Sequence, residues 1–110
     1  MPLTHPELLQ RLGMADAQME AFCSKWKVVE MAFFGSVLRD DFRPDSDVDV
    51  LVTFAFDAHW GLFKFAAMAD ELETILNRKV DLLTRRGVQE GRNWIRKKAI
   101  LDTAQVIYAA

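Results

Sequence analysis

The chain has one cysteine, three prolines and five glycines among its 110 residues, and it lacks any long apolar run. A lone cysteine, Cys23, excludes a disulfide within the chain and a zinc site made of cysteines. The N-terminus has no charged segment followed by a long apolar core, and no stretch approaches the roughly 18 apolar residues of a membrane span. A signal peptide and a transmembrane helix are therefore not expected, and the predicted location is cytoplasmic.

Two common phosphate-binding motifs are also absent, because neither G-x-x-x-x-G-K-[ST] nor G-x-G-x-x-G occurs. The formal net charge of -2 gives no overall attraction to nucleic acid or anionic membranes, so any polyanion site has to be local. The composition, 51% hydrophobic and 27% charged, is that of a packed globular protein. With no repeat or linker, the chain is expected to form one domain over residues 1–110.

The pattern of apolar residues predicts an α/β (α+β) fold, in which helices pack a small mixed β-sheet in the order ααβαβαβα. Trp26, Phe65 and Trp94 occupy helical positions that are typical of a core. The predicted elements are a helix capped by Thr4 and ended by Gly13, a helix from Asp16, a strand Lys27–Phe34, a short helix Ser36–Asp41, a turn at 43–46, a strand Asp47–Phe54, a helix Leu62–Asn77, a strand Lys79–Thr84 and a final helix Asn93–Tyr108.

The most unusual segment is GSVLRDDFRPDSDVDVLV, Gly35 to Val52, in which five carboxylates and two arginines lie between Gly35 and Asp49. Like charges this close repel one another unless water or a cation screens them. In the predicted strand, Asp47 and Asp49 project to the same side with α-carbons about 6.5 Å apart, and the valines project to the other side. Two carboxylates at the start of an apolar strand indicate a divalent cation, and a solvated acidic turn is the alternative.

Asp81 places a further carboxylate inside an apolar strand. If that strand pairs beside Asp47–Phe54, three carboxylates converge as in sites that hold two Mg²⁺ ions for phosphoryl or nucleotidyl transfer. Gly35 permits a tight turn, and the helix after it would present N–H groups and the Ser36 hydroxyl to an anion. Arg39, one turn along that helix, would reach a phosphate or remain an ordinary surface residue. The residues predict a nucleoside triphosphate between the turn and the metals.

The spacing of Asp45, Asp47 and Asp49 also resembles the start of an EF-hand calcium loop. In such a loop the sixth residue is glycine and the twelfth is glutamate. Val50 and Phe56 stand at these two places, so an EF-hand is excluded.

Gly35-Ser36, ten further residues and then Asp47 to Asp49, with a later carboxylate at Asp81, resembles the signature of the DNA polymerase β-like nucleotidyltransferase superfamily. The short length resembles its minimal nucleotidyltransferase (MNT) subfamily. The resemblance implies that Asp47 and Asp49 hold two Mg²⁺ ions and the triphosphate of ATP. It also implies that Asp81 completes the metal site and helps to deprotonate the attacking hydroxyl.

One departure from the family pattern follows the Gly-Ser turn. Many relatives carry Arg-Gly there, whereas Arg39 is followed by Asp40 and Asp41 in this chain. The two acids leave the metal site intact and add negative charge near the expected phosphates, so they are expected to bear on substrate affinity.

The resemblance implies a partner as well, because the chain is too short to add a domain that holds an acceptor. Similar minimal proteins act as antitoxins beside a HEPN-domain ribonuclease toxin, which they modify with AMP from ATP at a tyrosine. His5 and His59 lack the upstream arginine of a HEPN ribonuclease, so the chain resembles the antitoxin. A catalytically silent module that masks the toxin and an enzyme that nucleotidylates a small molecule remain alternatives.

The last quarter of the chain is basic, in contrast to the acidic segment from Gly35 to Asp49. A solvated helix face is the simpler interpretation, and contact with a partner or a nucleotide is the sharper one. The basic residues are Arg85, Arg86, Arg92, Arg96, Lys97 and Lys98.

Overall fold

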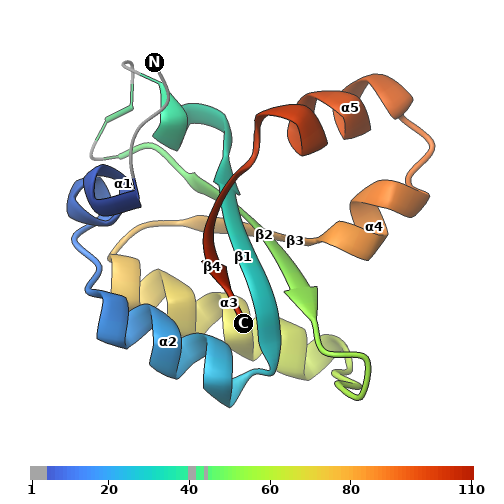
Figure 1. Cartoon of the computed structure of the whole chain (residues 1–110), viewed down its shortest axis with the longest axis horizontal. Helices are drawn as coiled ribbons and strands as arrows, with labels where there is room; N and C mark the ends of the chain where they lie inside the picture. Colours follow the sequence, from blue (N-terminus) through green and yellow to red (C-terminus); the bar gives the residue numbers. More distant parts are fainter. Residues whose placement is uncertain (1–4, 40–41, 44) are drawn as a thin grey trace.

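The structure, a computed structural model, describes residues 5–39, 42–43 and 45–110 (Figure 1). Within these residues it shows five α-helices, one 3-10 helix and four strands. None of the described helices has the length and apolar run needed to cross a bilayer. The elements are α1 (His5–Leu12), α2 (Asp16–Lys25), β1 (Val28–Phe34), η1 (Gly35–Leu38), β2 (Val48–Phe54), α3 (Leu62–Leu76), β3 (Val80–Thr84), α4 (Arg85–Glu90), α5 (Trp94–Thr103) and β4 (Gln105–Ala109).

The four strands form one mixed sheet in the order β3-β2-β1-β4. β1 pairs antiparallel with both β2 and β4, whereas β2 and β3 run parallel. The parallel pair needs a crossover, which α3 supplies between them. The expected α/β fold, a small mixed sheet packed by helices, is therefore confirmed.

One face of the sheet is covered by α1, α2 and α3 and contains the main core. Strand side chains alternate between faces, and the three valines of β2 point into this core with no exposed surface, as expected from the sequence. Cys23 of α2 is also fully buried there. Burial raises the pKa of its thiol to about 12, so it is a neutral packing residue at physiological pH.

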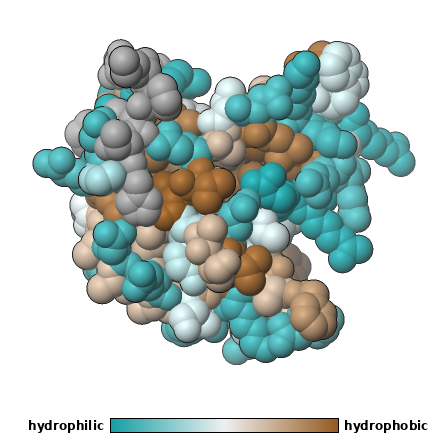
Figure 2. Space-filling model, in the orientation of Figure 1, coloured by the Kyte–Doolittle hydropathy of each residue, from teal (hydrophilic) through white to brown (hydrophobic). Residues whose placement is uncertain are grey.

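The opposite face is covered by α4 and α5, which project away from the other helices (Figure 1). Their outer surface is mostly hydrophilic in the view of Figure 2. A small cluster of four buried residues joins α5 to the sheet, and Asp49 and Asp81 belong to the same side of their strands as Leu51 and Leu83. The buried residues of this cluster are Ala32, Phe34, Leu51 and Ile100.

The predicted final helix Asn93–Tyr108 is wrong in its second half. Helix α5 ends at Thr103, and Gln105–Ala109 forms the edge strand β4 against β1. The segment contains Val, Ile and Tyr, which favour a strand once a sheet edge is available, and Ile107 is buried in the main core. Trp94, predicted to be a core residue, is 69% exposed.

Two further differences flank the strands. The short helix predicted for Ser36–Asp41 is a 3-10 helix that ends at Leu38, and Arg39 after it is extended. Helix α4 was not predicted, since it buries no residue and therefore has no apolar period to detect. The predicted cap at Thr4, the acids Asp40 and Asp41, and position 44 of the turn lie outside the described residues.

Candidate active site

The pairing of β2 with β3 brings two of the predicted carboxylates side by side. In the parallel register of these strands, Asp49 lies directly opposite Asp81. Asp47 is exposed and immediately precedes β2, so it lies at the end of the strand that carries Asp49. The condition set by the sequence, that the two strands pair as neighbours, is met.

Gly35 is the residue that lets the Gly-Ser turn lie against Asp49. Its φ is +77°, a conformation that strains any residue with a Cβ. A Cβ at this position would also lie 2.1 Å from Oδ2 of Asp49, far inside van der Waals contact. The turn and the aspartate therefore touch only because the residue is glycine.

Hydrogen bonds from side chains to backbone carbonyls hold the segment after this glycine. The Ser36 hydroxyl donates a hydrogen bond of 3.3 Å to the carbonyl of Asp47, which joins the turn to the start of β2. Arg11 of α1 donates to the carbonyls of Val37 and Arg39 at 2.8 and 2.7 Å. The Gly-Ser turn is thus anchored on both sides, and Arg39 follows the 3-10 helix instead of lying within it.

The electrostatic surroundings of Asp49 are unusual for an aspartate. Burial raises the pKa of Asp49, and the negative charges of Asp81 and Asp47 raise it further. The positive charges of Arg39 and Arg96 oppose this rise. Two arginines from distant segments therefore act on the same carboxylate, and a bound cation would relieve the repulsion among the three acids.

The donor set fits a hard divalent cation such as Mg²⁺, since all three groups are carboxylates. Among the described residues, no three His, Cys, Asp or Glu side chains gather closely enough to hold a metal ion by themselves. Mg²⁺ is usually held by one or two carboxylates together with substrate phosphates and water. The close register of Asp49 with Asp81, pressed against the Gly35 turn, is compatible with that mode.

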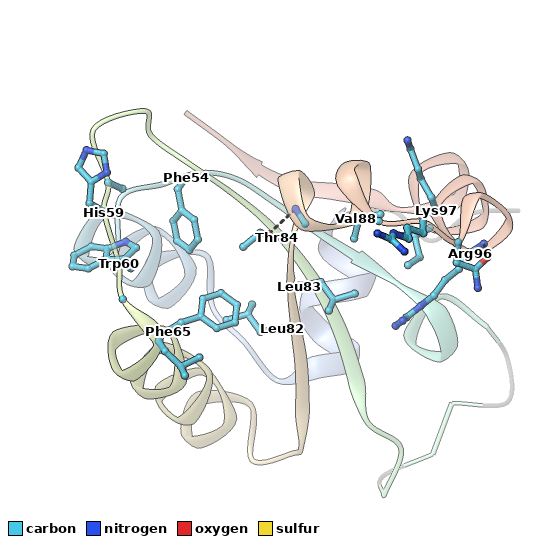
Figure 3. Close-up of a pocket in the computed structure, with 18 residues that line it drawn as sticks. Phe54, His59, Trp60, Phe65, Leu82, Leu83, Thr84, Val88, Arg96 and Lys97 are labelled. Carbon is cyan, nitrogen blue, oxygen red and sulfur yellow. Dashed lines mark hydrogen bonds between the residues drawn. The ribbon is translucent and has the colours of Figure 1, made fainter.

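A large open cleft of about 1110 Å³ lies along β3, directly after Asp81. Its walls do not include the three aspartates, and it meets them through Arg96, which lines the cleft and acts on Asp49. Figure 3 shows an aromatic group on one side of β3 and basic side chains on the other. We call these the aromatic end, which consists of Phe54, Trp60 and Phe65, and the basic end, which consists of Arg92, Arg96 and Lys97.

Arg96 has no individual signal in the sequence. There it is one member of the basic group, for which partner or nucleotide contact is one of two interpretations. The pairing of α5 with the open face of the sheet is what brings this side chain toward Asp49, and that pairing has no local signal in the sequence. The cleft could not be predicted for the same reason.

A Gly-Ser turn placed against an aspartate of a paired strand is the arrangement expected above for a nucleotidyltransferase. The chain belongs to the nucleotidyltransferase domain family, whose family model matches residues 16–107. The expectation of a nucleotidyltransferase is confirmed at this level.

Similar sequences carry more specific names. A protein of Methanocaldococcus jannaschii, provisionally named a protein adenylyltransferase, is 40% identical over 63 residues, which are 57% of this chain and 71% of that protein. Protein adenylyltransferase MntA of Thermococcus cleftensis is 36% identical over 67 residues, which are 61% of this chain and 66% of that protein. The matched segments thus span about two thirds of these relatives.

Solved structures share the fold. One provisionally named a minimal nucleotidyltransferase has a TM-score of 0.64 and 28% identity, with 94% of this chain and 95% of that chain covered. A complex of an MNT antitoxin with a tri-AMPylated HEPN toxin of Shewanella oneidensis has a TM-score of 0.60, with 94% and 73% covered. Its identity of 14% makes the second a likeness of fold alone. The resemblance to minimal nucleotidyltransferases is confirmed.

Proposed function

We propose that this chain transfers AMP from ATP to a hydroxyl group of a protein partner, a HEPN-type toxin encoded nearby, and so acts as its antitoxin. The observation that carries the proposal is the pair of Asp49 and Asp81 across two strands, packed against the Gly35 turn. The names of its sequence relatives support a protein acceptor. The fold neighbour bound to an AMPylated HEPN toxin supports the identity of that acceptor.

In this proposal the triphosphate lies between the Gly35-Ser36 turn and the strand end that carries the aspartates. The turn offers backbone N–H groups to the phosphates, with no Cβ in the way. Arg39 and Arg96 supply the nearby positive charge, as their action on Asp49 indicates. Both arginines would partly offset the negative charge that accumulates on the phosphates.

Asp47 and Asp49 would hold Mg²⁺, and Asp81 would complete a second metal position. When bound, these ions would neutralise phosphate charge and activate the attacking and leaving oxygens. The chain itself contributes position, because the register of β2 and β3 fixes Asp49 and Asp81 relative to each other. A rigid sheet is a suitable support for such a site, since small displacements of reacting groups are costly.

The transfer is a displacement at the α-phosphorus of ATP. The acceptor oxygen forms a bond to that phosphorus, the bond to the bridging oxygen of the β-phosphate breaks, and pyrophosphate leaves. The proton of the acceptor hydroxyl passes to Asp81, which is exposed and therefore accessible to an acceptor from outside the chain.

The test is incubation of the purified chain with labelled ATP, Mg²⁺ and the protein product of the neighbouring reading frame. We expect label on that protein, and we expect Asp47→Asn and Asp49→Asn to lower the rate by at least about 100-fold. Asp45→Asn is the matched control, because Asp45 is an exposed acid of the same run and has no role in the proposed site. It should keep wild-type activity.

The same experiment separates the alternatives. Label on a small molecule, without any protein partner, would assign the third function considered above. If the Asp49→Asn variant still neutralised the toxin in growing cells, the chain would act by masking the toxin, without AMP transfer. Absence of label on the partner, with both proteins folded and bound to each other, contradicts the proposal.

A further inference from the structure

The outer edge of β3 is open to the cleft. β3 is an edge strand, because in the described residues β2 is its only neighbour in the sheet. The carbonyl of Lys79 accepts from the Val48 N–H at 2.9 Å, whereas the N–H of Val80 points away from β2 and donates to Glu73 at 2.9 Å. Backbone groups alternate between the two edges of a strand, so those of Leu82 point outward as well.

α3 closes the first part of this edge, and the next part borders the cleft. Glu73 satisfies the Val80 N–H, which is a common way to blunt a strand edge. Leu82 and Thr84 beyond it line the cleft together with Leu83. Exposed strand edges bind extended peptides through backbone hydrogen bonds, with pockets on either side that select the side chains.

The pockets on the two sides of this edge differ in chemistry. The aromatic end is partly preformed, since Trp60 donates a hydrogen bond of 2.8 Å to the carbonyl of Trp26 and their rings pack edge to face at 5.3 Å. Leu62 and Phe63 at the start of α3 are 81% and 90% exposed beside it. The basic end carries three cations in a chain whose net charge is negative.

We propose that the open edge of β3 binds an extended segment of a protein partner, which places an apolar side chain at the aromatic end of the cleft and an acidic side chain at the basic end. The aromatic end lies far from the carboxylates, because Phe54 is five residues beyond Asp49 on β2, about 16 Å along the strand.

The edge connects this surface to the candidate active site. Asp81 precedes Leu82 on the same strand, so a segment paired with β3 passes beside the carboxylate that receives the acceptor proton. The role of the bound segment rests on the proposed function, because this segment would present the acceptor hydroxyl. Binding of the segment, however, requires neither ATP nor AMP transfer.

The test selects binders from a displayed library of random short peptides with the full chain as target, in the absence of nucleotide. We expect the enriched peptides to combine an aromatic or large apolar residue with Asp or Glu. Amide signals of Leu82 to Thr84 should shift in the NMR spectrum when the synthetic peptide is added. N-methylation of the paired peptide residue, which removes the backbone donor, should weaken binding at least about tenfold.

A charge reversal tests the basic end. R92E combined with K97E should lower the affinity for the acidic peptide at least about tenfold. The same double variant should bind the peptide better when Lys replaces its acidic residue. R86E combined with K98E is the matched control, because these two basic residues lie on α4 and α5 but do not line the cleft. The control should bind like the wild type.

Several results would overturn the inference. These are no enrichment of any sequence, shifts confined to residues away from β3, equal loss in both double variants, or a cleft that is covered by a second copy of the chain in solution. AMP transfer to a partner without binding at the β3 edge would contradict this inference and leave the proposed function intact. Binding at the β3 edge without AMP transfer would contradict the proposed function and leave this inference intact.

Discussion

The two faces of the sheet are built very differently. Among the described residues, the face under α1, α2 and α3 has a continuous core of twenty buried side chains, whereas the face under α4 and α5 has four. On the second face, Trp94 and Ile95 of α5 are 69% and 66% exposed. The candidate site belongs to this thinly packed face, and the cleft lies at the edge of the sheet, with its basic end on this face and its aromatic end on the other.

This difference indicates that the two faces have different roles. Buried apolar area is the main source of stability, so the first face supplies most of the free energy of folding. Burying the aspartates under a comparable core would cost free energy, because charges lose their hydration. The second face therefore leaves the strand ends that carry Asp47 and Asp81 exposed, and α4 and α5 cover the sheet beside them.

The largest effect that tests this comparison is a truncation on each face. Leu72→Ala, in the main core, should lower the free energy of unfolding by about 2–5 kcal/mol. Ile100→Ala should cost less, about 2 kcal/mol, because its small cluster borders solvent and relaxes more easily. Urea unfolding measures both, and amide exchange should rise only in α4 and α5 for Ile100→Ala. Equal losses, with global exchange in both variants, would contradict the comparison.

The next effect compares one glycine from each side. Gly13 and Gly35 both have positive φ, at +66° and +77°, but only Gly35 would place a Cβ against Asp49. Gly13→Ala should cost about 1 kcal/mol of stability and leave transfer unchanged. Gly35→Ala should in addition lower the transfer rate by at least about 100-fold, since it displaces the aspartate. Assays of both purified variants with labelled ATP decide this, and full activity of Gly35→Ala would break the assignment.

The sequence was sufficient where one face of an element is densely packed. The valines of β2, the helix from Leu62 and the second helix from Asp16 have clear apolar periods, and the structure confirms them. The first three strands each begin one residue later than predicted. At β1 the reason is visible, since Lys27 before it has a φ of +55° that no strand residue adopts.

Prediction failed on the second face, where the local pattern is weak. The residues from Gln105 onward continue a helical apolar stripe, and only the open edge of β1 makes them a strand. Asp81 could be placed beside Asp49 only on the condition that β2 and β3 pair, which is a tertiary fact. The roles of the three aspartates remain a prediction, whereas the contact of Asp49 with Gly35 of the Gly-Ser turn is observed in the structure.

The smallest effect concerns an ion pair on each face. Burial alone would raise the pKa of Glu71, but hydrogen bonds from Lys25 and Trp26 and the charge of Lys25 lower it below its ordinary 4.5. A lowered folded-state pKa adds stability above pH 4.5 that is lost as the pH falls through the folded-state pKa. Glu71→Gln should therefore cost about 1 kcal/mol or less at pH 7 and nothing once the wild-type carboxyl is protonated. Glu90→Gln, in the exposed pair with Arg86 on α4, is the control and should change stability less at either pH. Urea midpoints at neutral and acidic pH give the comparison, and a pH-independent loss for Glu71→Gln would mean that shape, not charge, fixes α2 against α3.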